Sequence, residues 1–366
     1  MKIYDTHSDI FSNLYERNLK GEKDIFQNYH VEPLKQGEVI GGIWVVYSEH
    51  DFDVEEAFDI ALKEYEPFKK DYDVVLGLEG LRNVPDLECL KRLYDRGIRH
   101  AMLTWNEENH LATGVAGDKT HGLKELGKEF IKFMEQNNMI VDVSHLNIKS
   151  FFEVMEVVTK PVIASHSCAY TLSDHRRNLN DTQLCVLKKN GGYVGVNSAR
   201  NFVSKDRSLQ TVKGLVDQIY YLIEHLDIDH VMLGLDMMDY LGDYGGNKET
   251  GLNDNLDDLA THADCQNIIA ELKRNYGVRA YPAWKHDKAM AIEQLAEELR
   301  TGRMLIPAKG ALDDEMDSIL YKRDEGTDAI IPELDEDLGI HPDIMMALLY
   351  ASRQYFHDLG IEVGGE

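Results

Sequence analysis

Short apolar segments recur along this chain and alternate with helical patterns, and this alternation constrains the fold more than any other feature. Such segments are typical of strands that are buried on both faces of a sheet. Strands alternating with helices predict parallel pairing through right-handed crossovers, and eight of them predict closure into a (β/α)8 barrel of the TIM type, an α/β fold. The predicted strands are residues 2–6, 39–46, 73–79, 98–104, 138–144, 161–166, 192–197 and 229–236.

Helical patterns fill most of the connections between these strands. They are predicted at residues 54–69, 85–96, 123–136, 148–158, 182–189 and 209–225. Pro85 is expected just inside the second helix, where the missing N–H of proline costs nothing. Gly97 and Gly191 follow basic or amide residues and predict helix C-termini.

The chain is predicted to form the barrel over residues 1–275 and a helical, acidic C-terminal extension over residues 276–366. Within the latter, residues 342–359 have a helical pattern. The extension could belong to the same domain, cover the active site as a lid, or contact another subunit. A homodimer is therefore one assembly that the sequence leaves open.

Charge and composition exclude several classes of partner. The formal charge of −26 argues against binding to nucleic acid or to an anionic membrane. No apolar stretch approaches the ~18 residues of a membrane span, and a strand pattern starting at Lys2 argues against a signal peptide. The four cysteines are far apart, which disfavours a disulfide framework. We therefore expect a cytoplasmic protein.

Five predicted strands end on side chains that can bind a metal ion. These side chains are His7 with Asp9, Glu79, His145, His166 and Asp236. In a parallel barrel the active site forms at the carboxyl ends of the strands. Acidic residues are abundant in this chain, so some of these matches arise by chance. His7 and Asp9 carry more weight, because side chains two residues apart on a strand leave on the same face and can bind one ion. Nitrogen and carboxylate ligands suit zinc, with manganese or iron as alternatives.

The segments around these residues resemble a known family. Those that carry the resemblance are Asp5-Thr6-His7-Ser8-Asp9, Gly77-Leu78-Glu79-Gly80, Val141-Asp142-Val143-Ser144-His145, Ile163-Ala164-Ser165-His166-Ser167 and Arg176-Arg177-Asn178. They are similar, in order and spacing, to motifs of the membrane dipeptidase (renal dipeptidase) family of zinc metallopeptidases. The resemblance covers about residues 1–275 and implies an amidohydrolase-type barrel that holds two Zn²⁺ ions.

The resemblance also implies a role for each ligand-type residue. His7 and Asp9 would hold one zinc ion, His145 and His166 would hold the other, and Glu79 would bridge the two.

Two further residues acquire roles in the same way. Arg177 would bind the C-terminal carboxylate of the substrate, and Asp236 would act as the acid/base residue near the scissile amide. Asp239 is the reserve candidate for the latter role, because the motif here reads Gly-Leu-Asp-Met-Met-Asp.

Other positions depart from the family pattern or have simpler interpretations. Trp105 follows Leu-Thr where relatives often carry a substrate-contacting histidine. His110 could replace that histidine, although a solvated loop histidine is the simpler interpretation. Asp142 is expected to be a buried hydrogen-bonding group, and His262 is expected at the surface.

The function implied by the resemblance is a dizinc dipeptidase that hydrolyses small dipeptides through a metal-bridging hydroxide. One alternative is the same metal site acting on another small amide or lactone. Another is a non-catalytic relative, in which Trp105 and the C-terminal extension fill the pocket and the protein binds a ligand or partner.

Overall fold

The computed structural model describes residues 1–366 except 48–50, 245, 248–251, 277–318, 324–329 and 335–366. Eight parallel strands close into one barrel, in which each strand pairs with the next and β8 pairs with β1. The strands are β1 (Ile3–Ser8), β2 (Val39–Tyr47), β3 (Asp73–Glu79), β4 (Ile98–Met102), β5 (Ile140–Asp142), β6 (Ile163–Ala164), β7 (Tyr193–Val196) and β8 (Val231–Leu233). The predicted TIM-type barrel is confirmed.

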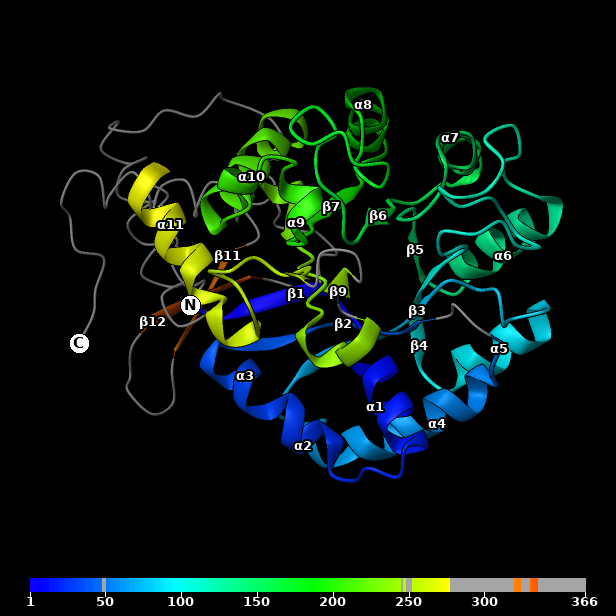
Figure 1. The fold of residues 1–366 in the computed structure, drawn as a ribbon, viewed down its shortest axis with the longest axis horizontal. Helices are drawn as coiled ribbons and strands as arrows, with labels where there is room; N and C mark the ends of the chain where they lie inside the picture. The colour runs from blue at the N-terminus through cyan, green and yellow to red at the C-terminus, as the bar shows by residue number, and fades with distance from the viewer. Residues whose placement is uncertain (48–50, 245, 248–251, 277–318, 324–329, 335–366) are drawn as a thin grey trace. The chain divides into compact units, whose positions relative to one another are not determined.

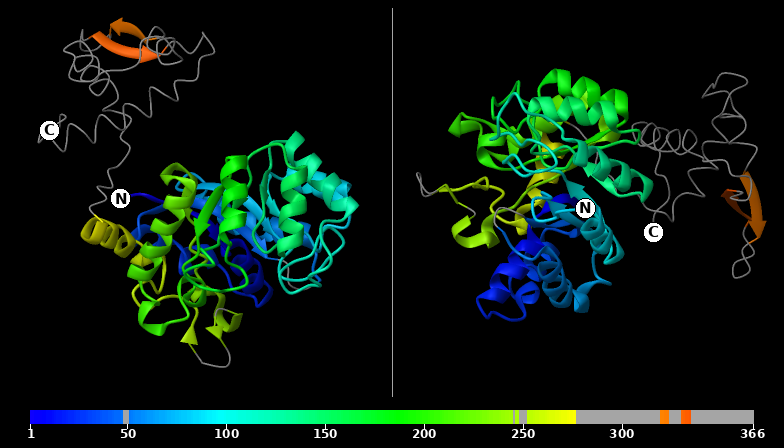
Figure 2. Two further views of the ribbon diagram at one scale, coloured as in Figure 1. Left: turned by 90° about the horizontal axis from the view of Figure 1, so that it is seen from above. Right: turned by 90° about the vertical axis from the view of Figure 1, so that its right-hand side faces the viewer.

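Helices lie outside the strands, as the views from several sides show (Figure 1, Figure 2). They are α1 (Ile10–Leu19), α2 (Ile25–Tyr29), α3 (Val31–Gln36), α4 (Val54–Tyr65), α5 (Leu87–Asp95), α6 (Glu125–Gln136), α7 (Ile148–Val157), α8 (Asp181–Asn190), α9 (Arg200–Val203), α10 (Val212–Leu226) and α11 (Gln266–Tyr276). Short 3-10 segments are η1 (Glu66–Phe68), η2 (Arg207–Leu209), η3 (Ile228–His230), η4 (Asp239–Tyr244) and η5 (His262–Asp264).

Local capping explains where several crossover helices begin and end. The side chain of Asn180 accepts a hydrogen bond from the backbone N–H of Gln183, and the side chain of Gln183 accepts one from the backbone N–H of Asn180. This capping box starts α8. Gly191 ends the same helix with a left-handed φ of 72°, as predicted. The expectation for Pro85 was wrong, because Asp86 caps α5 and proline therefore precedes the cap.

The core has two parts separated by the barrel wall. Along β2, Ile43 and Val45 point inward and form a small cluster with Ile163. The alternate residues Trp44 and Val46 point outward into the larger core between strands and helices. This alternation is what a strand buried on both faces requires.

The chain divides into two compact units, Met1–Tyr281 and Pro282–Glu366. In the second, the described residues form a hairpin of β11 (Ile319–Arg323) and β12 (Ile330–Leu334). The helix expected at residues 342–359 lies outside the described residues, so the proposed extension stays a prediction. Two further short strands, β9 (Gly246–Asn247) and β10 (Leu252–Asn253), pair after β8. No described helix is both long and apolar enough to cross a bilayer.

Candidate metal centre

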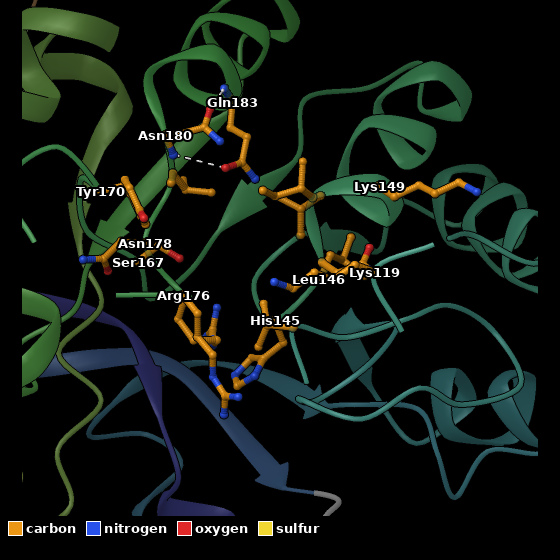
Figure 3. Close-up of a pocket in the computed structure, with 16 residues that line it drawn as sticks. Lys119, His145, Leu146, Lys149, Ser167, Tyr170, Arg176, Asn178, Asn180 and Gln183 are labelled. Atoms are coloured by element: carbon orange, nitrogen blue, oxygen red, sulfur yellow. Dashed lines mark hydrogen bonds between the residues drawn. The ribbon is translucent and has the colours of Figure 1, made fainter. Parts of the chain in front are cut away.

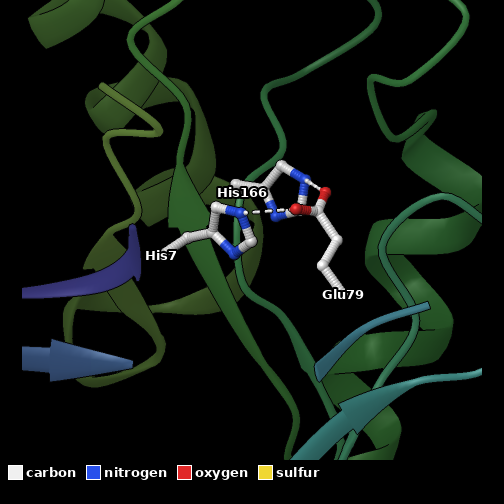
Figure 4. Close-up of side chains that lie close together, drawn as sticks. All are labelled: His7, Glu79 and His166. Carbon is white, nitrogen blue, oxygen red and sulfur yellow. Dashed lines mark ion pairs between the residues drawn. The ribbon is translucent and has the colours of Figure 1, made fainter. Parts of the chain in front are cut away.

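Six side chains that could bind metal ions meet at the carboxyl ends of the barrel strands. They are His7, Asp9, Glu79, His145, His166 and Asp236, and all six are buried. Figure 4 shows three of them, with His7 coming from β1, Glu79 from β3 and His166 from the loop after β6. The structure therefore brings together every residue that the sequence analysis named as a ligand or as the acid/base residue.

Glu79 lies at the centre of this group. Its Oε1 is 2.8 Å from Nε2 of His145 and 3.6 Å from Nε2 of His166. Its Oε2 faces the other way and is 3.4 Å from Nε2 of His7. A carboxylate with one oxygen toward each set of histidines has the geometry of a bridging ligand.

Two overlapping groups of ligand atoms meet the spacing that a metal ion needs. One contains His7, Glu79 and His166, and the other contains His7, Asp9 and Asp236. Within each group, the ligand atoms all lie within 4.8 Å of one another. His7 belongs to both, so the two groups adjoin.

The histidine nitrogens also fit a positively charged occupant. Nε2 of His145 and Nε2 of His166 lie only 2.9 Å apart. Nε2 of His7 is buried and has no hydrogen-bond partner among the described residues. Buried polar atoms are normally paired, and neutral imidazole nitrogens are common zinc ligands. The donor set thus fits divalent ions of the zinc type.

Burial and neighbouring charges set the protonation of the group. Burial, with a smaller contribution from Arg177, lowers the pKa of His145 to about 3. Burial also lowers the pKa of His166 well below its usual value. Burial alone would lower the pKa of His7, but the carboxylates of Glu79, Asp236 and Asp9 raise it to about 10. His145 and His166 are therefore neutral, which is the form that binds metal.

The loops after β5 and β8 hold two of these residues in an uncommon backbone conformation. His145 and Asp236 have positive φ angles of 67° and 56°. Such angles cost a non-glycine residue about 1–3 kcal/mol and cluster at functional sites. Backbone hydrogen bonds maintain them, since Asp236 N donates to His7 O and Val115 N donates to His145 O. The strands predicted here end early because the chain turns out of the sheet at these residues.

Three polar residues that the sequence analysis missed hold the site side chains in place. Asn106 Oδ1 lies 3.0 Å from Nδ1 of His145, and Asn197 Nδ2 donates to Oδ2 of Asp236 over 2.9 Å. Such outer contacts orient metal ligands. Asn197 follows β7 directly and could have been found as a polar strand end, whereas nothing in the sequence singles out Asn106.

Ser165 is the third of these residues. Its hydroxyl lies 2.9 Å from Nδ1 of His166 and 3.4 Å from Nδ1 of His7, so it links the two rings, which stack at 3.8 Å. A Cβ atom at Gly195 or Gly234 would overlap the carbonyl oxygen of Ser165. Glycine at both positions therefore leaves room for the backbone of Ser165.

His262 corrects an expectation. It is only 2 % exposed, and its Nε2 lies 3.1 Å from Oδ2 of Asp5. The other oxygen of Asp5 accepts hydrogen bonds from the backbone N–H groups of His7 and Leu235. The prediction of a surface histidine was wrong because its partner lies 257 residues away in the chain.

Asp142 has the role expected for it. It is fully buried, lies 2.8 Å from Nε2 of His100, and accepts a hydrogen bond from the backbone of Ser165.

The residues predicted to contact substrate occupy different places. Arg177 is buried, and its Nη2 lies 2.6 Å from Nε2 of His166. The ring of Trp105 is tilted against that of His145 at 5.8 Å. His110 instead forms a hydrogen bond between its Nε2 and the carbonyl oxygen of Val84, at 2.9 Å. Arg177 and Trp105 thus adjoin the candidate metal ligands.

Asp239, the alternative candidate for the acid/base residue, starts η4 and accepts a hydrogen bond from Asn255. Asp236 is the residue that faces His7, with Oδ1 at 3.9 Å from Nε2.

Comparison with solved structures shows the same fold in metallopeptidases. A metallopeptidase from Rhodobacter sphaeroides, solved with a phosphinate mimic of the dipeptide L-Ala-D-Ala, superposes with a TM-score of 0.62 at 19% identity. The match covers 75% of this chain and 92% of that one. The probable dipeptidase PvdM from Pseudomonas aeruginosa gives a TM-score of 0.56 at 18% identity over 77% of this chain and 90% of that one.

Sequence comparison gives closer relatives over shorter spans. An uncharacterised dipeptidase of Schizosaccharomyces pombe is 38% identical over 169 residues, which are 44% of this chain and 41% of the relative. The dipeptidase tcpJ of Claviceps purpurea is 28% identical over 62% of this chain and 54% of the relative. The chain thus spans about half the length of these curated relatives.

A family model also matches the chain. The model of the membrane dipeptidases, peptidase family M19, matches residues 67–280, which are more than half of the sequence. The matched range includes four of the six residues of the candidate metal centre. The chain belongs to the membrane dipeptidase family, peptidase family M19.

Proposed function

We propose that the protein is a dizinc-dependent dipeptidase that hydrolyses the peptide bond of small dipeptides. The observation that carries this proposal is the position of Glu79, whose two oxygens face His7 on one side and His145 and His166 on the other. Family membership and the dipeptide mimic held by the Rhodobacter sphaeroides relative support the same reaction class.

The two ions would be held by the side chains that the resemblance names. His7 and Asp9 would hold one ion, His145 and His166 would hold the other, and Glu79 would contact both. When bound, two such ions activate a water molecule and polarise the carbonyl that it attacks. Manganese or iron would fit the same nitrogen and carboxylate donors.

Asp236 would move the proton in this reaction. Burial raises the pKa of Asp236 to about 6, a value suited to exchanging a proton near neutral pH. Asn197 donates to its Oδ2, which leaves Oδ1 facing His7. We propose that Oδ1 takes the proton from the attacking water and delivers it to the nitrogen of the leaving amino acid.

Arg177 would fix the substrate by its C-terminal carboxylate. Its guanidinium is buried beside His166, and burial lowers its pKa to about 10, so it stays charged. A planar guanidinium can bind a carboxylate through two parallel hydrogen bonds. That contact would place the peptide bond of a dipeptide near the metal ligands.

Metal analysis combined with a hydrolysis screen tests the proposal. The purified protein, reconstituted with zinc, is assayed against dipeptides, other small amides and lactones. Bound metal with dipeptide turnover supports the proposal. Bound metal with turnover of only another amide or a lactone would mean that the substrate is not a dipeptide. The absence of both metal and turnover would indicate a non-catalytic relative.

A further inference from the structure

A cavity of about 460 Å³ adjoins the candidate metal centre (Figure 3). It lies beside the loops that follow β5 and β6, and both His145 and Arg177 line it. His145 belongs to the metal-centre group and Arg177 contacts His166, so the cavity borders the place where a substrate would react. Ligand pockets usually have volumes of about 300–1,000 Å³, so this one can hold a whole amino-acid residue.

The cavity is lined by cations in a strongly acidic protein. Lys119, Lys149, Arg176 and Arg177 line it, and no carboxylate is among its lining residues in the described part of the chain. Lys149 contributes least, because its ammonium donates to the carbonyl of Thr120 and points away from the other labelled side chains in Figure 3. Against a net charge of −26, this clustering of positive charge marks the cavity as a site for an anion.

Two helices add to the positive potential. The N-cap residues of α7 and α8, Asn147 and Asn180, both line the cavity. Each of these helices has ten residues, and the N-terminal end of a helix carries a partial positive charge that favours anions.

An unpaired hydroxyl points independently to a ligand. Ser167 lines the cavity and is fully buried, yet its Oγ has no hydrogen-bond partner among the described residues. Leaving a buried polar group unsatisfied costs about 1–3 kcal/mol. A ligand with an acceptor oxygen would remove that cost, and Ser167 directly follows His166.

We propose that this cavity receives the acidic side chain of a dipeptide's C-terminal residue, so that the enzyme prefers substrates ending in glutamate or aspartate. This inference rests on the proposed dipeptidase function. With the main-chain carboxylate on Arg177, the adjoining side chain would extend toward Arg176, Lys119 and the hydroxyl of Ser167.

The test compares substrates of nearly equal shape and different charge. Hydrolysis of Ala-Glu is measured against Ala-Gln, and Ala-Asp against Ala-Asn, with the zinc-loaded full chain. We expect kcat/KM to favour each acidic substrate by at least about tenfold, which corresponds to about 1.4 kcal/mol. A ratio near one would overturn the inference and leave the dipeptidase function intact. No hydrolysis of any dipeptide would overturn both.

Variants then locate the preference in the cavity. Arg176→Gln and Ser167→Ala should each reduce the ratio of kcat/KM for Ala-Glu over Ala-Gln. Lys128→Gln, on the outer surface of α6, removes the same charge as Arg176→Gln and should keep the wild-type ratio. Equal effects of Arg176→Gln and Lys128→Gln would mean that net charge, not the cavity, sets the preference, and would overturn the inference.

Binding gives a readout that does not depend on turnover or on the fold of a variant. Free glutamate, the C-terminal product of Ala-Glu, should raise the Tm of the wild-type protein more than glutamine at the same concentration. Equal shifts with the two amino acids would contradict a cationic pocket for the side chain.

Discussion

Arg177 is the residue that we propose binds the C-terminal carboxylate of the substrate. Its side chain is buried and contacts His166 directly. Arg177→Lys should lower kcat/KM for free dipeptides, because lysine cannot reproduce the two parallel hydrogen bonds. The loss of transition-state stabilisation should be roughly 2–5 kcal/mol. Dipeptide amides lack the C-terminal carboxylate, so they should be poor substrates that change little. Equal losses on both kinds of substrate would show that Arg177 has only a structural role.

Trp105 is the second residue whose identity we expect to affect turnover. Its ring packs against Tyr47 at 4.9 Å and lies beside His145, so it adds apolar surface where the family resemblance implies a substrate-contacting histidine. We expect a preference for apolar side chains next to this ring. Trp105→His should raise kcat. The increase should reach about 10²–10³-fold if the imidazole N–H donates a hydrogen bond to the developing oxyanion. Unchanged kinetics in Trp105→His with inactivity in His110→Ala would assign that role to His110 instead.

At the scale of elements, η5 supports the end of β1 from outside the barrel. His262 binds Asp5, and Asp5 holds the backbone of His7 and Leu235. His262→Ala should lower the free energy of unfolding by about 1–3 kcal/mol, because alanine cannot donate a hydrogen bond to the buried carboxylate of Asp5. It should also weaken zinc binding, since His7 is less firmly held. His121→Ala, at an exposed histidine, is the control for denaturant unfolding, and equal stability of the two variants would contradict this account.

The same scale shows what the sequence can and cannot predict. Strands β1 to β4 and the crossover helices follow from apolar runs and periodicity, so their positions agree with the prediction to within a few residues. β5, β6 and β8 are shorter than predicted. After β5 and β8 the apolar runs continue into loops where His145 and Asp236 adopt left-handed conformations. His262 was misassigned because its pairing with Asp5 depends on tertiary structure, which no local pattern encodes.

At the scale of the whole molecule, a buried histidine makes stability depend on pH. Burial, with smaller contributions from His262 and Arg17, lowers the pKa of His30 to about 3. The unfolded chain, with a histidine pKa of about 6.5, therefore binds a proton that the folded protein does not. The stability is fully present above about pH 6.5 and falls by up to about 1.4 kcal/mol per pH unit as the pH drops toward 3.

Unfolding measurements at two pH values test this dependence. Between pH 7 and pH 5, the wild-type protein should lose more free energy of unfolding than His30→Gln, whose amide does not titrate. Parallel pH profiles for the two proteins would mean that His30 is protonated in the folded state or that other groups dominate.

The central claim is that one carboxylate at the end of β3 serves two metal ions. Elemental analysis of the zinc-reconstituted protein tests it most directly, with Glu79→Ala measured beside the wild type. We expect about two ions per wild-type chain and weakened retention of both ions in the variant, because a single side chain contacts both sets of ligands. A wild-type chain without metal would contradict the metal centre, and a variant that loses one ion but keeps its activity would contradict the bridging role of Glu79.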